Sequence, residues 1–528
     1  MSESSPLLSR TASNASSADA DADAEKIPSW HFNLVPTFTT ISPKYRWVPL
    51  LGCTLIFINE AEYFVKQVAT MRAIESMYCY NYHLARGSHL AELGKRIPEQ
   101  LCKDDSIQKH IARTAGLIMF VRMLSAMVGA VPLGYVADRW GRKIVVVMHK
   151  VNVVVSCSAW LAFYVAFPKV PIWMLYLSGL PGLFGGNFDV GLAMLFASYT
   201  DVMPSATERA SLFFLTTSTQ FLAQTFCPLI GAWLMNLDGK GGTPQVNLAV
   251  SLGMSVLTAL IAIFLWPETL HETKIKFSDT EDGTATPTQR GHDPKPRRGS
   301  LVSSFFHTRL AAITDSISGI GLLNISLLSF SIMLAATGIK AIDWYGLVQY
   351  PVIKLHWSFP EASYIVSIQG VLMLAHFSLV LPCLNSVAAR YFGSSSHGHF
   401  ATMAGSALLL TLGSLLIGFS TSTLSFVLGV IVYLFGEGLP TATQAFIVSL
   451  VEKRQVARIM ATLSMTSIFG KLCASLLFPK VLAWGLDSKL ELLVGLPFFS
   501  SAALFAISGL CFMVVGMKMW RAQRLEES

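Results

Sequence analysis

The sequence has 528 residues, of which 52% are hydrophobic and only 13% are charged, and its mean hydropathy is +0.52. A soluble domain carries about twice that share of charged residues, so the composition excludes an ordinary soluble protein and indicates one embedded in a bilayer. The net charge of +7 is compatible with nucleic-acid binding, but the basic residues fall in short loops between apolar runs, so no nucleic-acid partner is expected.

Residues 1–45 are rich in Ser, Ala and Asp and contain no apolar run long enough for a signal peptide. We therefore expect a disordered cytoplasmic N-terminus. Within it, Glu3-Ser-Ser-Pro-Leu7-Leu8 has the form of an acidic dileucine sorting signal, similar to those that direct membrane proteins to vacuoles. Such a short pattern also arises by chance, which leaves both the plasma membrane and the vacuolar membrane open.

Twelve apolar stretches follow, each long enough to cross a hydrocarbon core of about 30 Å. They are expected to be helices, because a backbone in lipid must satisfy its own hydrogen bonds. The predicted fold class is therefore an all-α membrane protein with twelve transmembrane helices. The predicted spans are 47–68, 114–137, 144–167, 172–197, 211–235, 246–266, 319–342, 363–384, 399–420, 424–447, 459–484 and 491–516.

The short loops between these spans predict the orientation, because Lys and Arg concentrate on the cytoplasmic side. One side carries Arg139, Arg142, Lys143, Arg209, Arg390, Lys453, Arg454, Arg458, Lys518, Arg521 and Arg524. The opposite short loops carry Lys169, Lys240, Lys354 and Lys489. Both termini are therefore expected in the cytoplasm, including a short tail at 517–528.

A long charged outer loop is expected over residues 69–113, between the first two spans. It contains Cys79 and Cys102, and an extracellular position permits a disulfide between them; two free thiols are the alternative. The other six cysteines lie in apolar spans and are expected to pack there. No CxxC or Cys/His spacing suits a metal ion, so no metal site is expected.

The turn between the second and third spans reads Gly134-Tyr-Val-Ala-Asp138-Arg139-Trp-Gly141-Arg142-Lys143. Gly134 is expected to let two helices approach closely, and Gly141 to permit a tight reversal. Asp138 is expected to end a helix and to favour one state of a gate, while the three basic residues hold the turn at the inner membrane face. The full pattern G-x-x-x-D-R-x-G-R-K resembles the loop between helices 2 and 3 of the major facilitator superfamily.

After the sixth span the chain becomes rich in Thr, Pro, Gly and charged residues, so residues 267–318 are predicted to be a cytoplasmic linker. Within it, Arg297-Arg298-Gly299-Ser300 resembles a basophilic kinase site. Ser300 is therefore a candidate phosphosite, with a chance match in a basic linker as the alternative.

An internal repeat relates the two sides of this linker. Leu183-Phe184-Gly185 in the fourth span recurs as Leu434-Phe435-Gly436 in the tenth, and the same offset relates Pro228 to Pro479 and Trp233 to Trp484. Residues 46–266 and 319–516 are therefore predicted to be two copies of a six-helix half. Transporters with such repeats place their substrate site between the halves, near the middle of the membrane.

The spans, the linker and the turn motif together resemble the major facilitator superfamily over residues 46–518, which implies two pseudo-symmetric six-helix halves. The segment Arg72-Ala-Ile-Glu75-Ser-Met-Tyr-Cys79-Tyr80-Asn-Tyr82 resembles fungal members related to the proton-coupled folate and haem-carrier group. Many such fungal proteins are thought to export secondary metabolites or toxic compounds. The glycine series at 179–186 lacks the Arg that drug:proton antiporters usually carry, so antiport does not follow from a motif.

Charged groups at the centre of a membrane helix cost at least about 2.5 kcal/mol each, so they usually face a cavity or a partner. The candidates for a substrate and proton pathway are Glu60, Glu62, Arg122, Asn187, Asp189, His376, Glu437 and Lys471. Glu437 and Lys471 are expected at one depth, either as a static ion pair or with Glu437 carrying the coupling proton. Arg122 is expected to pair with one of the two glutamates of the first span.

The remaining polar groups of the spans have less specific roles. Asn187 and Asp189 either face the cavity or form a local helix bond, and His376 either relays protons or packs among apolar neighbours. Lys340 and Asp343, near the outer end of the seventh span, are expected to extend towards the membrane surface. His149 and Lys150 are expected to do the same at the inner end of the third span.

No Walker A loop, nucleophile elbow or metal cluster appears, which argues against an ATP-driven pump and against an enzyme. We expect a secondary active transporter, monomeric and without a cofactor, that uses the proton gradient to export a secondary metabolite or toxic compound by alternating access. The alternatives are proton-coupled uptake of an organic anion or nutrient, and a non-transporting sensor on the same fold. The plasma membrane is the expected location.

Overall fold

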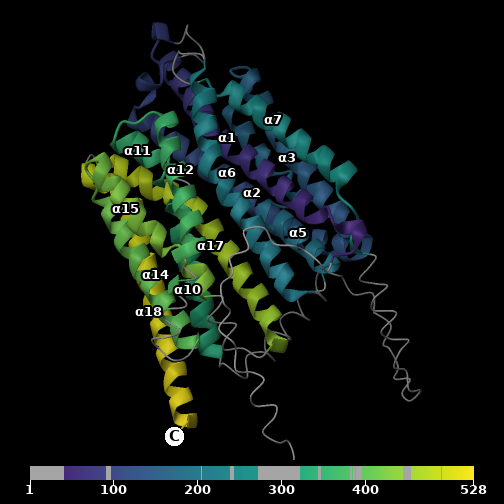
Figure 1. The fold of residues 1–528 in the computed structure, drawn as a ribbon. Coiled ribbons are helices and arrows are strands. Elements are labelled where there is room, and N and C mark those ends of the chain that lie inside the picture. The colour runs from purple at the N-terminus through teal and green to yellow at the C-terminus, as the bar shows by residue number, and fades with distance from the viewer. Residues whose placement is uncertain are drawn as a thin grey trace, which may run out of the picture. The chain divides into compact units, whose positions relative to one another are not determined.

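The computed structural model describes residues 41–527 except for 91–96, 204, 238–242, 271–321, 343–345, 381–382, 385–386, 388–394, 444–452 and 489. Within these ranges every regular element is a helix (Figure 1). The predicted disordered N-terminus to residue 40, almost all of the predicted linker with Ser300, and Asp343 lie outside the described residues.

The N-terminal helices, α1 to α7, begin after a short 3-10 helix, η1 (Pro43–Tyr45). They are α1 (Val48–Ala85), η3 (Glu99–Cys102), α2 (Asp105–Trp140), α3 (Arg142–Ala166), η4 (Ile172–Gly179), α4 (Gly182–Gly185), α5 (Phe188–Val202), α6 (Ala206–Asn236) and α7 (Gln245–Leu260), which continues into the π-helical η5 (Ile261–Leu265).

The C-terminal helices, α10 to α18, follow the central segment. They are α10 (Leu322–Ala341), α11 (Gln349–Lys354), α12 (Phe359–Ala375) with the π-helical η7 (His376–Val380), α14 (Ser395–Gly418), α15 (Thr423–Gly436), α17 (Lys453–Asp487), η8 (Glu491–Gly495) and α18 (Leu496–Glu527).

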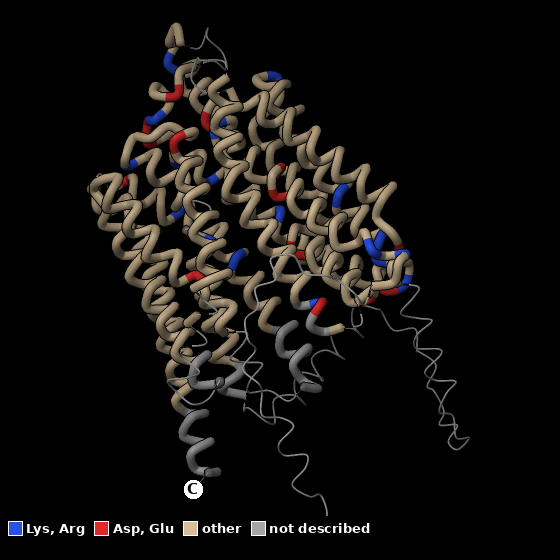
Figure 2. The backbone as a smooth tube through the Cα atoms, viewed as in Figure 1, with Lys and Arg blue, Asp and Glu red and all other residues tan. Residues whose placement is uncertain are grey.

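Most of these helices are suited to a bilayer. Ten helical stretches are long and apolar enough to cross a membrane, and α10 adds a shorter apolar stretch at Ser326–Lys340. With α6, which carries more Ser, Thr and Gln, they form the twelve-helix layout of an all-α membrane protein. Figure 2 shows charged residues gathered mainly near helix ends, with a few in the helix interiors.

Much of the expected outer loop at 69–113 is helical, because α1 continues to Ala85 and α2 begins at Asp105. The charges that argued for a loop are neutralised in the fold: Arg72 and Glu75 are 2% and 0% exposed and form an ion pair one helical turn apart.

At the start of α2, Asp104 accepts a 2.9 Å hydrogen bond from the Ser106 amide. Hydrogen bonds from Ser106 hold the pKa of this exposed carboxyl below its usual range.

Two of the expected spans are interrupted. In the fourth, α4 ends at Gly185 and α5 begins at Phe188; Gly186 between them has φ +67°, which favours glycine. In the tenth, α15 ends at Gly436, a turn follows at Glu437, and helix resumes at residue 439. Gly185 and Gly436 are the equivalent glycines of the internal repeat, so both copies break at the same point.

The N-terminal and C-terminal helices meet mainly through two contacts, α6 against α12 and α2 against α17. Figure 1 shows α12 beside α6. The breaks in the fourth and tenth spans are not part of these two contacts and lie at a cavity. Residues of the two breaks, Asn187 and Glu437, line a cavity between the two sets of helices.

Candidate functional site

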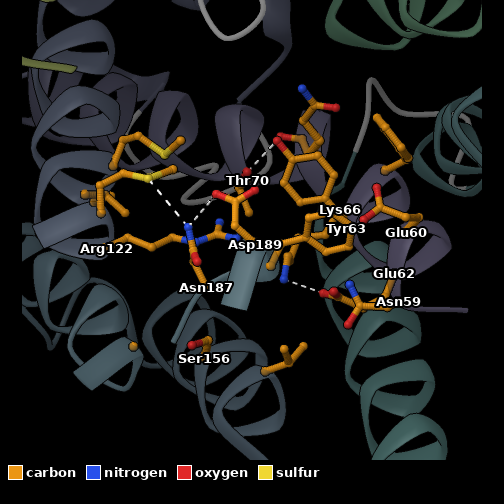
Figure 3. Close-up of a pocket in the computed structure, with 18 of the residues that line it drawn as sticks. Asn59, Glu60, Glu62, Tyr63, Lys66, Thr70, Arg122, Ser156, Asn187 and Asp189 are labelled. Carbon is orange, nitrogen blue, oxygen red and sulfur yellow. Dashed lines mark hydrogen bonds and ion pairs between the residues drawn. The ribbon is translucent and has the colours of Figure 1, made fainter. Parts of the chain in front are cut away.

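A cavity of about 360 Å³ is lined by residues of both helix sets. Its walls come from α1, α2, α3, the segment η4 to α5, and α6 on one side, and from α10, α12, α15 and α17 on the other. Eight charged side chains line it: Glu60, Glu62, Lys66, Arg122, Asp189, Lys340, Glu437 and Lys471. Figure 3 shows the part of this cavity formed by the N-terminal helices.

Glu62 has two partners within the N-terminal helices. Lys66, one turn further along α1, forms an ion pair with it, and the Cys157 thiol of α3 donates a hydrogen bond to Glu62 Oε1 at 2.9 Å. Arg122, the partner expected from the sequence, does not contact Glu62. The reason is local, since Lys66 lies on the same helical face at a spacing of four residues.

Glu60 is arranged differently although it lies only two residues away. It is 5% exposed and lines the cavity. Among the described residues, neither Glu60 nor Arg122 has a hydrogen-bond or ion-pair partner. Four charged residues act electrostatically on Glu60, namely Lys150, Glu62, Arg122 and Asp189. The expected pairing of Arg122 with a glutamate of α1 is therefore absent from this structure.

The break between α4 and α5 brings Asn187 and Asp189 to the cavity. Asn187 is the N-cap of α5, where its side-chain oxygen accepts a hydrogen bond from the Val190 amide at 3.3 Å. Its Nδ2 donates to Asp189 Oδ2 at 3.0 Å, and the same carboxylate oxygen lies 4.0 Å from Lys471 Nζ of α17. The ion pair that the structure gives Lys471 is thus with Asp189 rather than with Glu437. The pair connects the N-terminal to the C-terminal helices.

Glu437 and His376 have different surroundings. Glu437 lines the cavity, but as the C-cap residue that follows α15 and not as part of an unbroken helix. His376 is 2% exposed, at the start of η7, and contacts the rings of Phe377 and Phe435. It is not among the residues that line the cavity.

Four cavity or near-cavity residues were missed as site candidates. Lys66 is not among the residues predicted from the sequence, although its spacing of four residues from Glu62 indicates an ion pair on one helical face. Lys340 lines the cavity instead of extending to the surface. His149 and Lys150 are 3% and 4% exposed; His149 Nδ1 lies 3.2 Å from the Gly185 carbonyl, and Lys150 donates to Asn59 Oδ1 at 2.7 Å. These contacts join α3 to α1 and to the break after α4, so they depend on tertiary packing.

The charged turn between α2 and α3 is held by the carboxylate of Glu268, which lies outside the turn motif. Glu268, just after η5, accepts hydrogen bonds from the Arg142 and Lys143 amides at 3.0 and 3.2 Å. It therefore caps the N-terminus of α3, where the helix dipole favours a negative charge. Arg142 in turn bonds Asp138 at 2.8 Å and lies 3.5 Å from Asp201.

The glycines of this turn have different roles. Gly141 has φ +120°, and a Cβ there would overlap the Glu268 carboxylate, so glycine is needed both for the backbone and for the close approach. A Cβ at Gly134 would meet nothing within 4 Å, so the expected close helix contact at Gly134 is wrong. Arg139 points back to Tyr135, whose hydroxyl accepts its hydrogen bond at 2.6 Å.

At the opposite end of α1 and α2, Cys79 and Cys102 form a disulfide. It lies beside a buried polar cluster in which Lys103 bridges Glu75 and Glu99, at 3.1 and 2.6 Å. Glu99 also accepts a 2.8 Å hydrogen bond from the Phe359 amide in the first turn of α12. The disulfide-linked segment therefore contacts the C-terminal helices directly.

Among the described residues, no group of three or more His, Cys, Asp or Glu side chains is placed to hold a metal ion. The cavity instead offers charged and amide groups, including Asn59, Gln224 and Gln369. Such a surface can bind a polar organic molecule.

Comparison with known families matches residues 106–380 to the Major Facilitator Superfamily. Among curated proteins, the MFS efflux pump atnC of Emericella nidulans is 25% identical over 95% of this chain and 93% of its own length. The MFS-type transporter aprT of Aspergillus flavus is 24% identical over 83% of this chain and 82% of its own. The efflux pump ustT of Aspergillus flavus is 24% identical over 73% of each chain.

Solved structures give the same fold at low identity. A bacterial homologue of the human lysosomal transporter Spinster matches with a TM-score of 0.60 at 13% identity, covering 91% of this chain and 98% of its own. The nucleoside transporter NupG matches with a TM-score of 0.58 at 13% identity, covering 89% of this chain and 98% of its own.

Proposed function

Because the chain belongs to the major facilitator superfamily, we propose that it is a secondary active transporter that exports a small organic solute. The proposed solutes are secondary metabolites that fungi make or toxins that they expel. The named efflux pumps among its relatives support the outward direction. The proposal assigns transport and no enzymatic reaction.

One observation carries the transport assignment: the charged cavity is lined by both the N-terminal and the C-terminal helices. A site between two repeats is exposed to one side of the membrane and then to the other when the repeats rock against each other. The solute binds in this cavity, and the helices around it reorient.

The proposed driving force is the proton gradient, and the proposed coupling residue is Asp189. Its ion pair with Lys471 joins the two helix sets across the cavity. A pair in that position must break when the sets move apart. Protonation of Asp189 removes one of the two charges of this pair and lowers the free energy needed to separate the two side chains. No cofactor is needed for this step.

The proposed location is the plasma membrane, with both termini in the cytoplasm and the protein acting as a monomer. The basic turn at Arg139, Arg142 and Lys143 then lies inside, and the Cys79–Cys102 disulfide lies outside, where an oxidising environment preserves it.

The test is untargeted metabolite profiling of cells and medium, with and without the protein. Export predicts compounds that collect inside cells lacking the protein and are depleted from their medium. A nutrient-like compound left in the medium of those cells would favour uptake instead. Profiles that do not change, together with altered gene expression, would favour a sensor.

A further inference from the structure

We propose that the substrate of this cavity is amphoteric, carrying a cationic amine that Glu60 binds and an anionic group such as a carboxylate that Arg122 binds. The inference rests on the proposed transport function and names the class of substrate. It starts from an inventory of the charges that line the cavity.

Six of the eight charged residues in the cavity wall interact with other groups of the protein. Glu62 pairs with Lys66, and Asp189 pairs with Lys471. Glu437 and Lys340 also have partners. Within the described part of the chain, the two that have neither a hydrogen bond nor an ion pair are Glu60 and Arg122.

Burying the Glu60 carboxylate without a hydrogen-bond or ion-pair partner is energetically unfavourable. A carboxylate that is 5% exposed has lost nearly all of its hydration and has gained no hydrogen bond in return. The neighbouring Lys150 does not compensate it by direct contact, because its ammonium donates to Asn59. An ammonium group from a ligand in the cavity would supply both the opposite charge and the missing donors.

Arg122 supplies the complementary half of the site. It reaches the cavity from α2 and acts electrostatically on Glu60, but the two do not form an ion pair. Figure 3 shows Arg122 beside Asn187 and Asp189 on one side of the view and Glu60 on the other. A guanidinium group with free donors binds a carboxylate through two parallel hydrogen bonds.

The two groups are therefore separated poles of one cavity. A ligand with a single charge would satisfy one pole and leave the other buried without a partner, whereas an amphoteric ligand satisfies both. The cavity volume of about 360 Å³ is enough for a small organic molecule that spans them. Specificity of this kind is strong, because a missing ligand group leaves a buried protein group unpaired.

The experiment uses the purified full-length protein in nanodiscs and four probes on one skeleton. The probes are the dipeptide Phe-Ala with both ends free, its N-acetyl form, its C-terminal amide and the form capped at both ends. The thermal unfolding midpoint is followed against probe concentration. The free dipeptide should stabilise at the lowest concentration, and each cap should raise the half-saturating concentration at least about tenfold.

Substitutions then assign each charge to its residue. In Glu60→Gln the effect of N-acetylation should fall below about twofold while the effect of amidation remains, and Arg122→Gln should show the reverse. The exposed residues Glu491 and Lys480 provide matched controls, since Glu491→Gln and Lys480→Gln should keep the wild-type pattern. Where Glu60→Gln does not fold, Glu60→Asp should keep the order of the four probes with weaker binding.

Equal stabilisation by all four probes, or by none of them, would overturn the proposal, as would an equal loss for every probe in both variants. The export proposal is tested independently of the amphoteric site. If profiling finds exported compounds that lack either the amine or the acid, export stands and the amphoteric site is wrong. If profiling finds no export while the probe pattern appears as expected, the site stands and the direction of transport is wrong.

Discussion

Lys471 Nζ of α17 lies 4.0 Å from Asp189 Oδ2 of α5, and this ion pair crosses the cavity between the N-terminal and C-terminal helices. The two side chains are 32% and 50% exposed, so water and protons reach the pair. In the proposed mechanism, this charge pair links the protonation of Asp189 to the relative movement of the two helix sets.

The first prediction concerns this pair. Asp189→Asn should remove most of the pH dependence of transport in proteoliposomes, because the residue no longer titrates and the pair is permanently broken. Lys471→Gln should also weaken the coupling, since it removes the other charge. Lys480→Gln, on the exposed side of the same helix, is the control and should behave as wild type. Full pH dependence in Asp189→Asn would transfer the coupling role to another carboxylate.

Glu437 provides a second test of the same assignment. It also lines the cavity but caps the C-terminus of α15 at the repeat-related break, and the structure pairs Lys471 with Asp189 instead. Glu437→Gln should therefore change the transport rate while leaving the pH profile in place. The measurement is the initial rate across a pH series. A flat profile in this variant would restore the expectation that Glu437 carries the coupling proton.

The turn between α2 and α3 gives a prediction about stability. Glu268→Gln should cost roughly 1 kcal/mol, because it weakens the charged cap on α3, whereas Asp138→Asn should cost less than about 1 kcal/mol, since Asp138 is 73% exposed. Thermal unfolding of the two variants in detergent would compare them. Asp138→Asn should still slow transport if the turn controls a gate. A larger loss of stability in Asp138→Asn than in Glu268→Gln would contradict the geometry.

The disulfide gives a prediction about the other end of the molecule. Replacing Cys79 and Cys102 together by Ser should lower the free energy of unfolding by about 2–4 kcal/mol, and a reductant should lower the unfolding temperature of the wild type. Cys383, which is exposed and free, is a matched control, because Cys383→Ser should unfold as the wild type does. A wild type that is insensitive to reductant would mean that the bridge does not contribute.

Hydropathy was sufficient to predict the helices, because each membrane helix needs a long apolar run and little else. The breaks within the fourth and tenth spans were harder to predict from the sequence. Gly185 and Gly436 were visible in the repeat and Gly186 in the glycine series at 179–186, but apolar content alone does not separate a continuous helix from a broken one. The extension of α1 was missed because Arg72 and Glu75 were interpreted as loop charges, although their spacing of three residues suits an ion pair on one helix.

The sequence predicted most of the charged residues that line the cavity but not how they pair. Burial cost identifies charged residues such as Glu60 and Asp189 as candidates for any cavity. The partner of each depends on which helix faces which, and that is a property of tertiary packing. Depth alone suggested Glu437 for Lys471, whereas the break before α5 brings Asp189 closer. Glu268 was missed for the same reason, since it caps a helix more than a hundred residues away in sequence.

The most direct test of proton-driven export uses inside-out vesicles from cells that contain the protein, loaded with an acidic lumen. A compound identified by metabolite profiling is added outside. We expect that it accumulates in these vesicles, that a protonophore abolishes the accumulation, and that Asp189→Asn vesicles do not accumulate it in response to the pH gradient. Accumulation that occurs only in right-side-out vesicles, or that persists in the wild type after the gradient is collapsed, would contradict proton-driven export.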